Sequence, residues 1–158
     1  MKSNASDILV AKNIREHGCH VYSVFAHEES GSPSFSYSIG LEDSVGVPDV
    51  IVLGENASIG KSMIDAYQEF AVAGMRFERS RLYADFLGGG FKVYIEPVER
   101  DAVAEYMLGC FRWYGERPWR AVQIVFPSTQ GVWPWEEDAP RWLAKGQPML
   151  GRPRLDVT

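Results

Sequence analysis

The sequence has 158 residues, of which 46% are apolar and 13% aromatic, and its formal net charge is −5. This length suits one domain, and the apolar content is sufficient for a packed core, which argues against an intrinsically disordered chain. The acidic balance argues against a protein that mainly binds nucleic-acid backbones, because such affinity depends on clustered lysine and arginine. We therefore expect a single domain over residues 1–158 that binds no nucleic acid.

Cysteine content and the N-terminal segment indicate a compartment. Cys19 and Cys110 lie far apart and form no Cys-x-x-Cys pair, so no disulfide framework is indicated. The N-terminal residues lack the apolar core of a signal peptide, and no apolar run approaches the ~20 residues that a membrane span needs. These features predict a cytoplasmic protein that does not enter the membrane.

The first half of the chain alternates helix and strand patterns. Helices are indicated by apolar residues three and four positions apart before a glycine, and strands by residues that alternate around turn-forming segments. In the segment PSFSYSIGL (33–41) the serines are expected to form the polar face of a strand. The predicted elements are a helix over 6–17 capped by Ser6, a strand pair over 19–27 and 33–41, a strand over 49–54, and a long helix from Asn56 or Ser58 to Gly74.

The second half predicts two more strands and a second long helix. Residues 91–98 alternate with one polar face, and Pro97 ends that strand. The glycine triplet 88–90 indicates a hairpin turn or bulge, and residues 75–81 are left open between strand and loop. The remaining elements are a helix over 99–114, a strand over 120–127 and a loop-rich C-terminal segment over 127–158.

This order of elements predicts an α+β domain. Hairpins interrupt any regular β-α-β alternation, so we expect a largely antiparallel or mixed sheet with two main helices packed on it. A split-barrel sheet is the alternative.

The three histidines, His17, His20 and His27, raise the question of a metal site or a catalytic pair. Gly18 separates His17 from His20, and Cys19 and His20 point to opposite faces of a strand, so no metal site is expected. His27 could approach Ser34 or Ser36 across a hairpin, but no Gly-x-Ser-x-Gly elbow is present to support a serine nucleophile.

The tryptophans are concentrated late in the chain, and Trp133-Pro134-Trp135 falls in a predicted loop. Exposed aromatic side chains braced by proline suit ligand or partner binding. The alternative is that they fold back over the sheet and seal the core. By contrast, the segment around Gly60-Lys61-Ser62 departs from the phosphate-loop pattern, so no nucleotide site is expected there.

Several ordered segments resemble the bacterial domain family called DUF4262, over roughly residues 12–151. The segments that carry the resemblance are HGCHV (17–21), FSYSIGLED (35–43), PDVIVLG (48–54), VQIVFPSTQGVWPW (122–135) and QPMLG (147–151). Two positions depart from the family pattern: Ser38 replaces the usual threonine, and Val47 replaces the usual histidine. The resemblance implies one compact bacterial cytosolic domain and no particular activity.

Two functions are expected from these observations. The first is a binding module that neutralises or regulates a protein partner such as a toxin, steered by acidic residues next to Trp135. The second is a small-molecule-binding protein or an enzyme, with a pocket between the 36–40 strand and the 133–135 loop. No metal or cofactor is expected. The candidate ligand- or partner-binding residues are His20, Tyr37, Ser38, Gly40, Gln123, Trp133 and Trp135.

Overall fold

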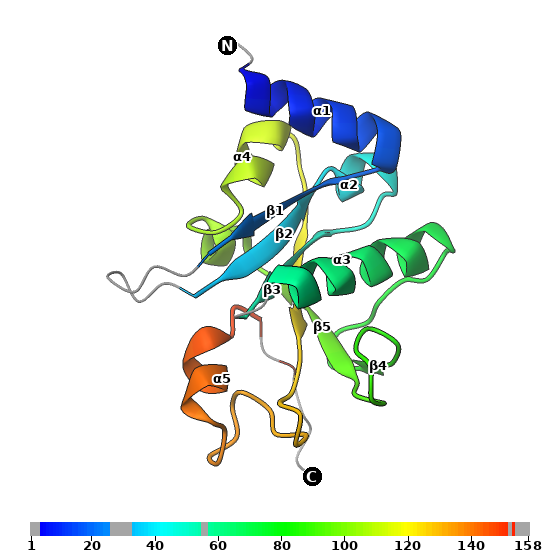
Figure 1. The fold of residues 1–158 in the computed structure, drawn as a ribbon. Helices are drawn as coiled ribbons and strands as arrows, with labels where there is room; N and C mark the ends of the chain where they lie inside the picture. The colour runs from blue at the N-terminus through cyan, green and yellow to red at the C-terminus, as the bar shows by residue number, and fades with distance from the viewer. Residues whose placement is uncertain (1–3, 26–32, 55–56, 152, 154–158) are drawn as a thin grey trace.

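The structure is a computed structural model that describes residues 4–25, 33–54, 57–151 and 153. Figure 1 shows the arrangement of its helices and strands. The predicted cap Asn56 and the histidine His27 lie outside these residues. The elements in chain order are α1 (Ala5–His17), β1 (His20–Val24), β2 (Phe35–Ile39), α2 (Leu41–Ser44), β3 (Asp49–Leu53), α3 (Ala57–Val72), β4 (Leu82–Tyr83), β5 (Val93–Val98), a 3-10 helix (Arg100–Val103), α4 (Leu108–Tyr114), β6 (Ala121–Val125) and α5 (Arg141–Gly146).

The strands form one open, mixed sheet in the order β1-β2-β3-β6-β5-β4. The β3–β6 pair is parallel and the other neighbouring pairs are antiparallel. The α+β prediction is therefore confirmed, and the sheet does not close into the barrel that was its alternative. The described helices include none that is long and apolar enough to cross a membrane.

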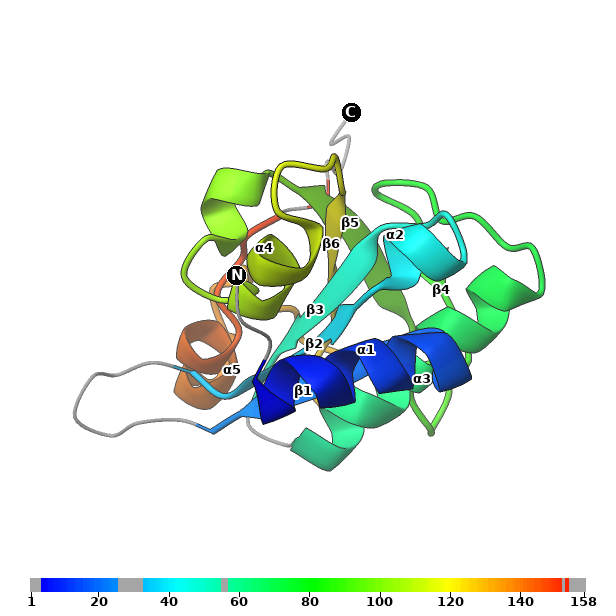
Figure 2. The same ribbon diagram turned by 90° about the horizontal axis from the view of Figure 1, so that it is seen from above.

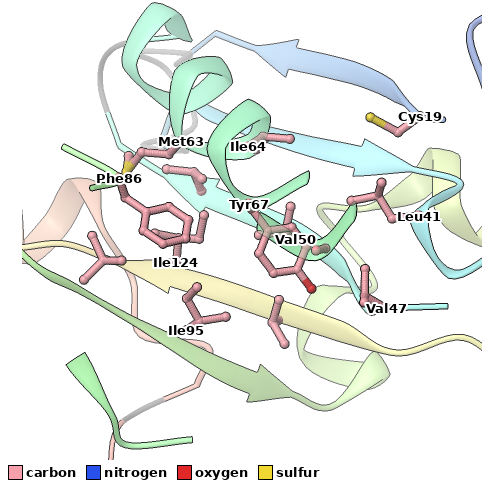
Figure 3. Close-up of a cluster of buried hydrophobic side chains, with 14 residues drawn as sticks. Cys19, Leu41, Val47, Val50, Met63, Ile64, Tyr67, Phe86, Ile95 and Ile124 are labelled. Carbon is pink, nitrogen blue, oxygen red and sulfur yellow. The ribbon is translucent and has the colours of Figure 1, made fainter. Parts of the chain in front are cut away.

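Helices cover both faces of the sheet. Helix α3 packs on one face, where Met63, Ile64 and Tyr67 point onto the strands (Figure 3). Helices α1 and α4 contribute Val10 and Cys110 to a second core on the opposite face. Figure 2 shows α1 and α3 along the β1 side of the sheet, with α5 beyond the ends of β2 and β3. The central strands are buried on both faces, as their apolar runs predict.

Four local predictions are corrected. Pro97 does not end its strand, because β5 continues through it to Val98. Helix α1 is capped by Asn4, which forms a reciprocal capping box with Asp7, while the Ser6 hydroxyl hydrogen-bonds with Tyr22. The predicted helix over 99–114 is divided into the 3-10 helix and α4. The serines of β2 are not on an exposed face, because every residue of that strand is buried.

Candidate functional site

A buried hydrogen-bond network centred on Asp49 of β3 lies at the end of β2. The Asp49 carboxylate accepts hydrogen bonds from the Ser38 hydroxyl (2.8 Å), the Leu41 backbone N–H (2.9 Å) and the Tyr114 hydroxyl. Ser38 also accepts one from Val50 N–H. Burial raises the pKa of Asp49 to about 6, although the hydrogen bonds from Tyr114, Leu41 and Ser38 oppose the shift. This network joins β2, α2, β3 and α4.

Tyr37 and Gly40 also serve the packing of β2. The Tyr37 hydroxyl accepts a hydrogen bond from Gly109 N–H at 2.9 Å, and burial raises the pKa of Tyr37 to about 12. Gly40 has φ +102°, and a Cβ there would lie 2.7 Å from the Ile14 side chain. Together with Ser38, these predicted residues hold β2 against α1, β3 and α4, and they do not line the pockets described below.

His20 lies beneath α1. Its Nδ1 is 2.8 Å from Asn13 Nδ2, and its ring meets the Tyr22 ring edge-on at 4.4 Å. Its Nε2 is buried and has no hydrogen-bond partner among the described residues, and burial lowers the pKa of His20. Among the described residues, no group of three or more histidine, cysteine or acidic side chains is placed to hold a metal ion.

Gln123 fastens the C-terminal segment to β6. Its Nε2 donates to Pro148 O, and its Oε1 accepts from the N–H groups of Leu150 and Gly151. Gln147 makes a similar bidentate contact with the backbone N–H and C=O of Phe126. The two amides hold the chain after α5 against the sheet, so the polar atoms of Gln123 are engaged internally.

Trp133 and Trp135 stack on each other at 5.2 Å and pack against Tyr94 of β5. In the sheet order, β3 and β6 lie between β5 and β2. The tryptophan pair is therefore separated from the Tyr37–Gly40 end of β2. None of the seven predicted residues lines the apolar pocket described next or either of two further pockets in the described part of the chain.

An apolar pocket of about 280 Å³ lies at a different place, where β3 and β6 end. It is bordered by the start of α3, by Leu87, Gly88 and Phe91, and by α5, which lies beside the lower end of the sheet in Figure 1. Its lining residues are Phe35, Ser36, Val52, Gly54, Ile59, Gly60, Met63, Leu87, Gly88, Phe91, Phe126, Pro127, Ser128, Thr129, Trp142, Leu143, Gly146 and Gln147.

The polar side chains of this pocket are largely engaged with protein atoms. The hydroxyls of Ser36 and Ser23 lie 2.8 Å apart, and Ser128 Oγ accepts hydrogen bonds from the N–H groups of Gln130 and Val132. The Gln147 amide is held by Phe126. None of the lining residues in the described part of the chain is charged. The pocket is therefore suited to binding an uncharged, mainly apolar group.

Most of the chain matches a known protein family. Residues 13–140 match the family described as Domain of unknown function (DUF4262). The chain belongs to the DUF4262 family. No curated protein and no solved structure matches it. The match ends at Pro140, immediately before α5, so one wall of the pocket lies outside the matched part of this DUF4262 domain.

The pocket residues of this DUF4262 domain were missed by the sequence prediction. The sequence pattern indicated only a hairpin turn or bulge for the glycine triplet and only a loop-rich segment for residues 127–158. One available signal was the sequence PRWLAKG (140–146), in which Trp142 and Leu143 follow a proline and a glycine closes the segment. That pattern is compatible with the short helix α5, of which Leu143 is buried and Trp142 is 48% exposed.

Proposed function

We propose that this protein binds a small, uncharged, mainly apolar molecule in the pocket at the ends of β3 and β6. The observation that supports this proposal is that the described residues that line the pocket include no charged side chain. An ion would lose its hydration there without a compensating partner, whereas an apolar group would gain from leaving water.

The position of the pocket is a second support. Ligands of sheets with parallel strands commonly bind beyond the carboxyl ends of those strands. The β3–β6 pair is the parallel pair of this sheet, and its carboxyl ends lead into Gly54 and Phe126, both of which line the pocket. The sheet therefore offers the apolar pocket at an edge where ligand sites commonly occur.

The lining favours binding over catalysis. General acid–base or nucleophilic catalysis needs a titratable or activated group within hydrogen-bond reach of the substrate. Its described lining offers hydroxyls and one amide, and includes no histidine, cysteine, acidic or basic side chain. We therefore infer a binding protein.

Replacement of Gly88 by phenylalanine is expected to weaken binding of a neutral apolar probe at least roughly tenfold, by filling the pocket. A Cβ at Gly88 meets no atom within 4 Å, so the fold should tolerate the ring. The measurement is isothermal titration calorimetry with 2-naphthol and with 1-decanol. Unfolding curves check that the variant is folded. A second variant, Gly88→Leu, checks that the weaker binding comes from filling the pocket.

Lys92→Phe is the matched control, because it adds the same ring at an exposed position outside the pocket lining. Its affinity for both probes should equal that of the wild type. The proposal is wrong if neither probe binds the wild-type protein, or if a probe binds the folded Gly88→Phe variant as tightly as the wild type.

Binding of a protein partner is a second candidate, favoured by the exposed acidic residues Glu136, Glu137 and Asp138. Glu136 also accepts a hydrogen bond from Trp133 N–H, so only the other two are free of that structural role. A basic partner, such as a toxin with a basic active site, would be steered to this loop. Chemical cross-linking in extracts of the native host should capture a basic protein with the wild type and lose it with the double variant Glu137→Lys/Asp138→Lys. Identical cross-links for the two proteins would contradict this candidate.

We also infer that the protein works in the bacterial cytoplasm. Cys19 and Cys110 are free and buried, which suits a reducing compartment. Burial raises the pKa of the Cys19 thiol to about 12 and that of Cys110 well above its usual range, so neither is activated as a thiolate.

A further inference from the structure

We propose that the ligand of this pocket carries a neutral aromatic ring system with one hydrogen-bonding group at its edge. This inference rests on the proposed function and names the chemical class of the ligand. Three independent features of the pocket support it: the ring contacts of its aromatic side chains, the hydrogen bonds of its hydroxyls and its volume.

Three of the four aromatic side chains that line the pocket differ from most of those in the rest of the protein, whereas the fourth, Phe35, contacts the rings of Tyr37 and Tyr106. Phe91, Phe126 and Trp142 line the pocket from three separate segments, and none makes a ring-to-ring contact with another described aromatic side chain. Aromatic rings gain stability from stacked or edge-to-face contacts beyond the area they bury. The pocket thus presents three rings that have no such contact.

Elsewhere in the described chain, aromatic side chains are mostly grouped with one another. Phe77 contacts the rings of Tyr67, Phe70, Tyr83 and Phe86 beneath α3. A second group joins Trp119 to Phe111 and Tyr114, and a third joins Trp133, Trp135 and Tyr94. An aromatic ligand would give the three pocket rings the ring contacts that most other aromatic side chains of the protein already have.

The hydroxyls place the polar group of the ligand. Ser36 and Ser128 are engaged in hydrogen bonds within the protein, as is the Gln147 amide. Thr129 is exposed and lines the pocket, and its hydroxyl makes no hydrogen bond with any described residue. A ligand hydroxyl, carbonyl or ring N–H directed toward Thr129 would find a partner there, and the rest of the ligand would need none.

The volume of the pocket suits a small ring system. At about 280 Å³ it lies at the small end of the ~300–1,000 Å³ that is typical of ligand sites. A fused bicyclic ring with one substituent is a ligand of that scale. The pocket also suits 2-naphthol, which serves as the test compound.

The test compares three neutral alcohols with the same number of non-hydrogen atoms: 2-naphthol, decahydro-2-naphthol and 1-decanol. Their dissociation constants are measured by calorimetry on the full-length protein. The aromatic alcohol should bind roughly tenfold more tightly than either saturated alcohol, because only it gains the ring contacts. Naphthalene, which lacks the hydroxyl, should bind roughly threefold more weakly than 2-naphthol.

Two variants locate the contacts. Trp142→Leu removes a half-exposed ring, so the fold should survive, and it should weaken 2-naphthol binding roughly fivefold while leaving 1-decanol unchanged. Thr129→Val keeps the shape of the side chain and should remove the advantage of 2-naphthol over naphthalene. A variant of merely lower stability would weaken all four probes alike.

The outcomes separate the two proposals. If the saturated alcohols bind as tightly as 2-naphthol, and Gly88→Phe blocks all of them, the aromatic class is wrong and the binding function stands. If no probe binds, or if Gly88→Phe blocks none, the function itself is wrong. If 2-naphthol binds best but Trp142→Leu and Thr129→Val change nothing, the assigned contacts are overturned.

Discussion

Replacement of Asp49 by alanine is expected to lower the free energy of unfolding by about 3 kcal/mol. Asp49 is fully buried, and its carboxylate accepts hydrogen bonds from Ser38, Leu41 and Tyr114. Alanine would leave these buried donors without an acceptor, and each unsatisfied donor carries its own desolvation penalty. Urea unfolding followed by tryptophan fluorescence measures the loss.

Asp65→Ala is the matched control for this prediction. Asp65 pairs with Lys61 one helical turn away on the exposed side of α3, and such pairs contribute only ~0.3–0.5 kcal/mol. Equal losses for the Asp49 and Asp65 variants would show that the network at the end of β2 does not hold the fold together.

The same carboxylate predicts a pH dependence of stability. The pKa of Asp49 is raised from 3.8 to about 6, so the native state binds a proton more tightly than the unfolded state. This contribution to stability is fully present below the unfolded pKa and is lost as the pH rises through about 6. The free energy of unfolding of the wild type, measured at several pH values, should therefore decrease as the pH rises through about 6 because Asp49 loses its proton. The Asp49→Asn variant, which cannot titrate there, should lack this part of the slope, and equal slopes would contradict the assignment.

Gly40→Ala is expected to cost about 3 kcal/mol, for two reasons that add. The residue has φ +102°, which L side chains rarely adopt, and a Cβ would lie 2.7 Å from the Ile14 side chain of α1. Alanine therefore forces α1 away from the end of β2 as well as straining the turn. The loss is measured by urea unfolding under the same conditions as for Asp49.

Gly46→Ala separates these two causes. Gly46 also has a positive φ, +76°, but a Cβ there meets nothing within 4 Å. It should cost only ~1 kcal/mol, from backbone strain alone. If the two glycine variants lose the same stability, the close approach of Ile14 contributes nothing.

The sheet was largely predictable from the sequence, because its central strands are short, β-branched and apolar on both faces. The segment DVIVL gives β3 and AVQIV gives β6, and all ten residues are buried. Periodicity alone could not show that these two strands pair in parallel, nor that β2 lies next to β3. Those pairings depend on contacts between distant segments.

Helix 99–114 shows how tertiary contacts override a helical pattern. Met107 has a non-helical backbone, and α4 begins only after it. Gly109 then lets α4 approach β2 so closely that a Cβ would lie 2.5 Å from Ile39. Glycine disfavours a helix intrinsically, so this contact is a property of the packed fold that spacing does not reveal.

The apolar pocket was not predicted from the sequence. The sequence led to the expectation of a pocket between the 36–40 strand and the 133–135 loop, and of those two segments only Ser36 lines the pocket. The motif residues Tyr37, Ser38, Gly40 and Gln123 instead hold strands and termini together. Since hydrogen-bonded structural residues and ligand-binding residues use the same side chains, one sequence could not distinguish the two roles.

The most direct test of the proposed function is mass spectrometry of small molecules extracted from the protein purified from its native host. The wild-type protein and the Gly88→Phe variant are compared under the same conditions, with Lys92→Phe as the control. We expect a neutral molecule to be enriched with the wild type and the control and lost with the filled pocket. Identical extracts from all three proteins would contradict the claim that this pocket binds a ligand.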